Sequence, residues 1–137
     1  MNTFRKWTFI CGATVVLLAV LDRVFPVIEC GYPISNRQLS QLHLQHVVTR
    51  CSSYRVEFGN WPQGDTAKIC EALFGGNPRG IVFLTVEPRF RDAKGKVLDA
   101  WRTALNINVS HEGVTVTSAG KDRQFYTADD MALSKRT

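Results

Sequence analysis

Residues 35–62 read SNRQLSQLHLQHVVTRCSSYRVEFGNWP, and this stretch decides the fold because it predicts one long amphipathic helix. Ser35 and Gln38 have the spacing of a capping box, in which the serine accepts from a helical amide and the glutamine reaches back. Apolar residues then recur every three to five positions and lie along one side of about six helical turns. We expect these residues to face a core: Leu39, Leu42, Val47, Cys51, Tyr54 and Phe58.

A second, shorter helix is expected after the first. Gly59 ends the long helix, and Trp61–Pro62 begins an extended turn because the residue before a proline avoids helical backbone. The next helix starts at Asp65 or Thr66 and stops at Gly75–Gly76. Its apolar face consists of Ile69, Cys70, Leu73 and Phe74.

The second half of the chain has the pattern of strands. Three runs rich in β-branched residues predict strands over 81–86 (IVFLTV), 105–109 (LNINV) and 114–118 (VTVTS). The last two are joined by SHEG and are expected to form a β-hairpin, with Gly113 in the turn. The order of helices followed by strands predicts an α+β fold with a small antiparallel sheet.

The region before the long helix has the composition of a membrane segment. An uncharged apolar run extends from Trp7 to Leu21 and follows Arg5 and Lys6. The basic flank predicts a single-pass anchor with a cytoplasmic N-terminus, although a cleaved secretory signal has the same pattern. In both interpretations the domain is exported, so we divide the chain into residues 1–28 and 29–137.

Composition and motifs argue against several classes of function. The net charge is +5, but Lys and Arg are spread along the chain without a dense run, so no nucleic-acid partner is expected. His43 and His46 have a metal-binding spacing, yet their helix offers no third ligand. With no nucleophile motif and no phosphate-binding glycine loop, we expect no enzymatic activity.

The cysteines allow one internal disulfide in an exported domain. Cys11 falls in the apolar segment, which leaves Cys30, Cys51 and Cys70. Cys51 with Cys70 is the preferred pair because it would join the two predicted helices. The alternative is that these cysteines are small buried apolar residues.

Four groups of residues resemble one known family. They are Tyr54, Gly59, Trp61 and Pro62 at the end of the long helix, LFGGNPRG at 73–80, Asp99 with Trp101, and the loop SAGKDRQFYTADD at 118–130. In order and spacing the region from about Val47 to Leu133 resembles the periplasmic domain of major pseudopilins of type II secretion systems, within the type IV pilin-like superfamily. The loop is the most specific part, matching at Ser118, Gly120, Asp122, Asp129 and Asp130.

This resemblance implies a structural subunit without catalysis. It implies a single-pass protein of the bacterial inner membrane with its C-terminal domain in the periplasm. The expected partners are membrane lipid, other pseudopilin or secretion-system subunits, and further copies in a homo-oligomer. The family's signature glutamate, five positions after the processing glycine, is replaced by Leu17 after Gly12. This departure favours the alternative of an exported calcium-dependent binding or adaptor domain outside filaments.

The resemblance also implies a calcium ion in the terminal loop. Asp122, Asp129 and Asp130 stand at the family's carboxylate positions, and calcium takes six to eight oxygen ligands. Two alternatives stay open: Lys121 or Arg123 could pair with the carboxylates, or the loop could be an ordinary solvated acidic segment. Asp99 is expected to bond backbone amides in a structural turn, beside a Trp101 that covers the sheet.

Overall fold

This computed structural model describes residues 33–137. The predicted membrane segment, Cys11 and Cys30 lie outside the described residues. From Ile34 to Thr137 the chain forms one unit, and neither of its α-helices has the length and hydropathy that crossing a bilayer requires. The elements in chain order are α2 (Asn36–Phe58), α3 (Thr66–Leu73), the 3-10 helix η1 (Pro88–Phe90), β1 (Asn106–Ser110), β2 (Gly113–Ser118) and β3 (Met131–Arg136). The predicted α+β class is confirmed.

Helix α2 begins and ends where the sequence predicts. Ser35 has extended backbone, its hydroxyl accepts from the amide of Gln38, and the Gln38 side chain accepts from the amide of Ser35, which completes the capping box. Gly59 ends the helix in the left-handed region, at φ 78°, and its N–H donates to the carbonyl of Arg55. Glycine suits this position because it has no Cβ to clash there.

The buried side of α2 is rotated from the predicted stripe. Leu42 is 40% exposed, so its assignment to the core was wrong. Leu44 and Val48, which the prediction left out, are buried instead. The buried residues of α2 are Ser40, Leu44, Val47, Val48 and Cys51.

Helix α3 is also confirmed, with Asp65 as its N-cap. The Asp65 carboxylate accepts from the amide of Lys68, and this bond holds the pKa of Asp65 below its usual value. Ile69, Cys70 and Leu73 are buried as predicted. The helix ends at Leu73, and Gly75 then takes φ 110°.

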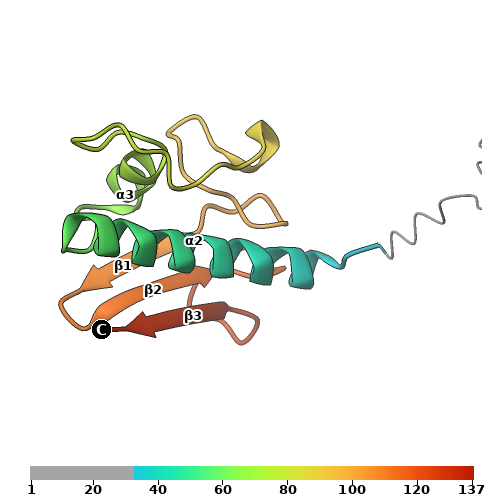
Figure 1. The fold of residues 1–137 in the computed structure, drawn as a ribbon. Coiled ribbons are helices and arrows are strands. Elements are labelled where there is room, and N and C mark those ends of the chain that lie inside the picture. Colours follow the sequence, from blue (N-terminus) through green and yellow to red (C-terminus); the bar gives the residue numbers. More distant parts are fainter. Residues whose placement is uncertain (1–32) are drawn as a thin grey trace, which may run out of the picture. The chain divides into compact units, whose positions relative to one another are not determined.

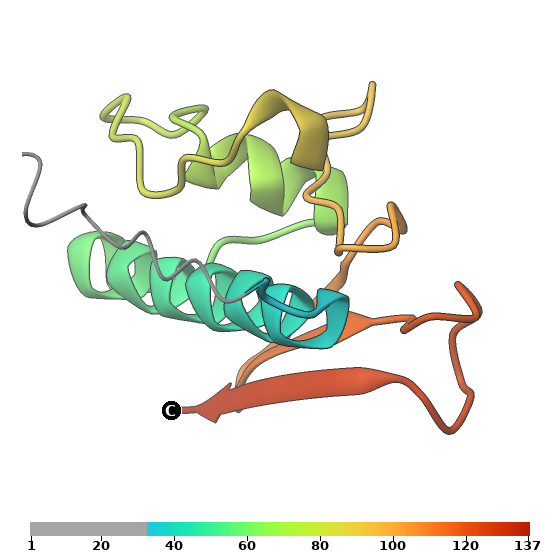
Figure 2. The same ribbon diagram turned by 90° about the vertical axis from the view of Figure 1, so that its right-hand side faces the viewer.

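The sheet has three antiparallel strands in the order β1-β2-β3. The predicted hairpin is present, with Ser110 opposite Gly113, and β3 is a strand that the sequence analysis missed. Helix α2 packs on β2 and β3, while α3 contacts β1 (Figures 1 and 2). The core between these layers includes Leu44, Val47, Ile69, Leu73, Leu105, Val114 and Val116.

The connection from α3 to β1 contains no strand at 81–86, so that prediction was wrong. The amides of Phe83 and Leu84 both donate to the carbonyl of Leu73 at the end of α3, and this is not the pairing pattern of a strand. Leu84 is buried and Val82 is 60% exposed.

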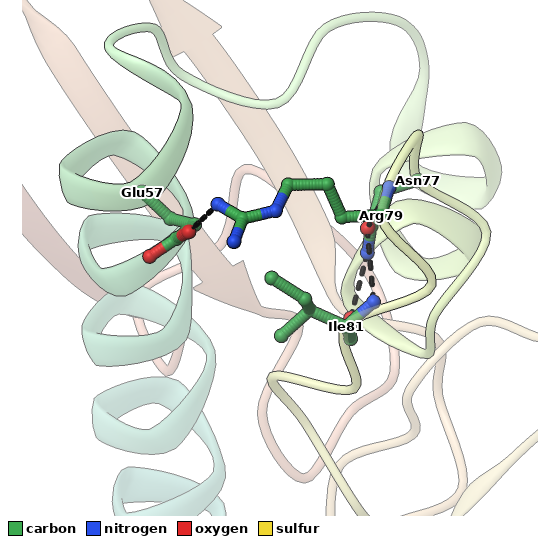
Figure 3. Close-up of polar contacts among 4 residues, drawn as sticks. All are labelled: Glu57, Asn77, Arg79 and Ile81. Carbon is green, nitrogen blue, oxygen red and sulfur yellow. Dashed lines mark hydrogen bonds and ion pairs between the residues drawn. The ribbon is translucent and has the colours of Figure 1, made fainter.

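A side-chain clamp shapes the start of this connection (Figure 3). The amide nitrogen of Asn77 donates to the carbonyls of Ala72 and Ile81, and its oxygen accepts from the amide of Ile81 at 3.0 Å. The neighbouring Arg79 forms an ion pair with Glu57 of α2. The segment therefore folds back toward the end of α2.

Candidate functional site

The acidic loop connects β2 to β3, at the end of the sheet where Ser118 pairs with Met131. Because these strands are antiparallel neighbours, the start and end of the loop lie close together. Asp122 is exposed, and Asp129 and Asp130 are partly exposed.

Asp129 joins the two sides of the loop. One carboxylate oxygen, Oδ2, accepts from the amide of Asp122 at 3.1 Å, and Oδ1 accepts from the Thr127 hydroxyl at 2.7 Å. The bond from Thr127, followed by the bond from the Asp122 amide, lowers the pKa of Asp129 to about 2. The carboxylate is therefore charged at neutral pH.

Asp130 closes a second turn beside Asp129. Its Oδ2 accepts from the amide of Tyr126 at 2.7 Å, and its Oδ1 lies 3.4 Å from the Thr127 hydroxyl. The Thr127 hydroxyl has a single proton, and the 2.7 Å contact makes Asp129 its main acceptor, while Asp130 lies beside it. Thr127 was not predicted from the sequence, although a hydroxyl two residues before an aspartate pair is a residue that forms such turns.

Asp122 contacts the Asp129–Asp130 pair through its backbone and not through its carboxylate. Its carboxylate accepts from the amide of Gln124 at 2.8 Å, so it faces its own turn, while its backbone amide contacts Asp129. Within residues 33–137 no three acidic, cysteine or histidine side chains are grouped as metal ligands. The loop brings two of the three predicted carboxylates together directly.

The cations beside the loop do not neutralise these carboxylates. In the described part of the chain the ion pairs join Arg79 to Glu57 and Arg89 to Glu87, and His111 lies 3.8 Å from Glu112. Pairing by Lys121 or Arg123, one of the alternatives from the sequence, is therefore not found. Backbone amides and a hydroxyl satisfy the carboxylates instead.

The backbone of the loop is unusual at three positions. Gly120 has φ 69°, and a Cβ there would collide with the carbonyl and the carboxylate of Asp129. Arg123 and Tyr126 also have positive φ, 61° and 71°, without being glycines. Such strain persists only where surrounding bonds determine the conformation, and here the Tyr126 amide donates to Asp130.

Asp99 anchors the base of the loop. It is fully buried, and its Oδ1 accepts from the amides of Trp101 at 3.0 Å and Thr103 at 2.8 Å. The Ser118 hydroxyl donates to Oδ2 of Asp99 at 2.7 Å and accepts from the amide of Gly120. The predicted structural turn at Asp99 is confirmed, and Trp101 packs partly buried against the core.

The two α2 histidines lie in different environments. Nδ1 of His43 is 3.0 Å from the carbonyl of Leu98, and its ring meets Phe90 edge-on at 4.6 Å. Burial lowers the pKa of His43 despite this hydrogen bond. His46 is exposed, so the two rings do not share one environment.

The predicted Cys51–Cys70 disulfide is wrong. Both thiols are free and buried, which agrees with the alternative that they fill the core. Burial raises the pKa of Cys51 to about 12 and raises that of Cys70 as well. Both cysteines are therefore inert thiols at neutral pH.

Comparison of the chain with protein-family models, with curated proteins and with solved structures gave no match. The resemblance to pseudopilins therefore depends on the residues and on where the structure places them.

Proposed function

We propose that this chain is a membrane-anchored, pseudopilin-like structural subunit of a type II secretion or type IV pilus-like envelope assembly. The observation that carries the proposal is the contact between two motifs far apart in sequence. Asp99, beside Trp101, bonds Ser118, which in turn bonds Gly120 at the base of the acidic loop. Residues of the resemblance thus form one hydrogen-bonded unit.

In this proposal the protein acts through binding rather than chemistry. The apolar segment holds the subunit in the inner membrane, and the domain in the periplasm presents α2 to neighbours. Helix α2 has apolar side chains that the domain leaves uncovered: Val56 is 87% exposed and Leu42 is 40% exposed. These two side chains remain available for contact with a neighbouring subunit.

Cross-linking in the bacterial membrane tests this proposal. The full chain is produced with Val56→Cys in a background in which Cys11→Ser and Cys30→Ser remove the two native thiols that precede α2. It is oxidised in cells and analysed for covalent dimers. Ala93→Cys, at an exposed position of the α3–β1 connection, is the matched control, and the buried native Cys51 and Cys70 are not expected to react. We expect membrane-bound dimers from Val56→Cys and few from Ala93→Cys.

Equal yields from the two variants, or a protein that carbonate extracts from the membrane, would contradict the structural-subunit proposal. A monomer that still responds to calcium would favour the alternative, an exported binding or adaptor domain. The replacement of the signature glutamate by Leu17 favours that alternative.

We also propose calcium as the ligand of the acidic loop, held by Asp129 and Asp130 with Asp122 completing the set. The donors fit calcium because they are all oxygens, and the carboxylates of Asp129 and Asp130 both lie near the Thr127 hydroxyl. A bound ion would offset the repulsion between these charges and fasten β3 to the sheet. Binding to the folded state alone then stabilises it.

Thermal unfolding of the full chain in detergent tests the calcium proposal. We expect excess calcium to raise the melting temperature above the value with chelator, and Asp129→Ala with Asp130→Ala to abolish the shift. Glu71→Ala with Glu112→Ala removes two exposed carboxylates elsewhere and should leave the shift intact. A wild-type melting temperature that calcium does not change would rule out the site.

A further inference from the structure

The two edges of the sheet differ in how their backbone groups are used. On β1, the amide of Ile107 donates to the hydroxyl of Thr66 at 3.1 Å, and that hydroxyl donates back to the Ile107 carbonyl at 3.4 Å. Just before β1, the amide of Leu105 donates to the carbonyl of Val97. The α3 side of the fold therefore covers the β1 edge at Ile107.

The β3 edge has no such cover. The amide of Thr137 donates to the carbonyl of Glu112, which fixes the alternation of the β2–β3 ladder. By that alternation the N–H and C=O groups of Ala132, Ser134 and Arg136 point away from β2. Among residues 33–137 no backbone hydrogen bond reaches these groups.

A groove runs beside this edge, under the first half of α2. Its volume is about 430 Å³. Arg37, Gln41 and Gln45 line it from the helix, and the residues at 130–133 line it from the strand. Figure 2 shows α2 running above β3. An added strand would have room there for alternate side chains.

The charges around the edge favour an acidic occupant. Lys135 and Arg136 lie on β3, and Arg37 lines the groove. Two acids lie nearby, Asp130 in the lining of the groove and Glu112 opposite the end of β3, so the three cations outnumber them. Lysine and arginine on an edge strand discourage pairing with like-charged or identical strands.

We propose that the β3 edge binds an extended acidic segment of a partner protein, which adds to the sheet as a fourth strand. Backbone bonds to residues 132, 134 and 136 would supply affinity, and the cations would select for acidic side chains. A second copy of β3 is disfavoured because it would bring its own Lys135 and Arg136. The inference does not depend on the proposed function.

Peptide binding to the full chain in detergent tests this inference. The probe is a fluorescent peptide of about nine residues with alternating Glu and Val, measured by anisotropy. Ser134→Pro removes an outward N–H without touching the ladder to β2. It also removes the hydroxyl contact between Ser134 and Thr115, and Ser134→Ala loses that contact alone.

We expect Ser134→Pro to bind about tenfold more weakly than wild type and Ser134→Ala to bind like wild type. Peptide addition should also slow amide exchange at Ala132, Ser134 and Arg136. If Ser134→Pro does not fold, Lys135→Glu with Arg136→Glu serves as the second variant and should weaken binding at least as much.

Three results would overturn the inference. One is the absence of binding to wild type, and another is equal binding of a Lys-Val peptide of the same length. The third is a wild-type dimer through β3, detected by sedimentation and lost in Ser134→Pro, because the occupant would then be a second copy. None of these measurements involves the membrane or an assembly, so their failure is distinct from failure of the proposed function.

Discussion

Asp99 shows how one buried carboxylate can organise two distant segments. It accepts from the amides of Trp101 and Thr103 and from the hydroxyl of Ser118. A buried charge is tolerated only where hydrogen bonds replace its lost hydration. These three donors explain why an aspartate occurs inside the core and why the acidic loop starts where it does.

Removing this carboxylate should destabilise the fold strongly. Asp99→Ala leaves the two amides and the hydroxyl without an acceptor, so we expect a loss of about 2–4 kcal/mol in the free energy of unfolding. Asp99→Asn keeps an acceptor for both amides and should cost less. Chemical denaturation of the full chain in detergent measures both variants, and similar losses for the two would show that the hydrogen bonds are not the reason.

At the scale of elements, glycines occupy one boundary of β2 and one of α2 for different physical reasons. Gly113 starts β2, and a Cβ there would collide with the carbonyl of Lys135 and lie 2.9 Å from Cα of Arg136. Gly59 ends α2 at φ 78°, with nothing within 4 Å of a Cβ. At Gly113 a side chain has no room beside β3, whereas at Gly59 there is room but the backbone is left-handed.

Alanine at these glycines should therefore have unequal effects. Gly113→Ala forces β2 and β3 apart and should cost about 2–4 kcal/mol. Gly59→Ala meets only the left-handed penalty of about 1 kcal/mol. Thermal unfolding of the two variants under identical conditions makes the comparison, and a larger loss in Gly59→Ala would contradict the packing at Gly113.

Elements with strong local signals were predictable from sequence. The capping box at Ser35, Gly59 at the end of α2, the Asp65 cap and the SHEG hairpin each depend on neighbouring residues, and each is present. The side of α2 that is buried was less predictable because Leu42 and Leu44 are equally apolar. Packing on β2 and β3 decides between them.

Elements that depend on distant partners were not predictable. Residues 81–86 have the composition of a strand, but the amides of Phe83 and Leu84 bond Leu73 and no neighbouring strand forms. Strand β3, MALSKR, has few strand-forming residues and exists because β2 offers it a free edge. The aspartates of the loop were predictable as a group, whereas the role of Thr127 required the fold.

At the scale of the described unit, α2 is also attached to the irregular connection. Its buried Ser40 hydroxyl accepts from the amide of Ala100, and His43 contacts the carbonyl of Leu98. Both contacts hold the segment that contains Asp99. Helix α2 therefore helps to position Asp99, which in turn bonds Ser118 at the base of the acidic loop.

The His43 contact predicts a pH dependence of stability. The pKa of His43 is below its ordinary 6.5 in the folded state, so the unfolded chain binds the proton more readily. The contribution of neutral His43 to the free energy of unfolding is therefore present above pH 6.5 and is lost as the pH drops below that value. His43→Gln keeps an N–H donor but cannot titrate.

We expect the melting temperature of wild type to fall further than that of His43→Gln when the pH is lowered from about 8 to about 5. His111→Gln is the matched control because His111 is exposed in the hairpin turn, and it should behave like wild type. Equal pH profiles for His43→Gln and wild type would remove His43 as the cause.

The capping box at Ser35 has a mechanical consequence. Among the described residues the first helical bond runs from the amide of Leu39 to the carbonyl of Ser35, and Ser35 itself has extended backbone. The start of helix α2 is therefore fixed by exposed side chains, and a force that opens its first turn must break the two reciprocal bonds between Ser35 and Gln38.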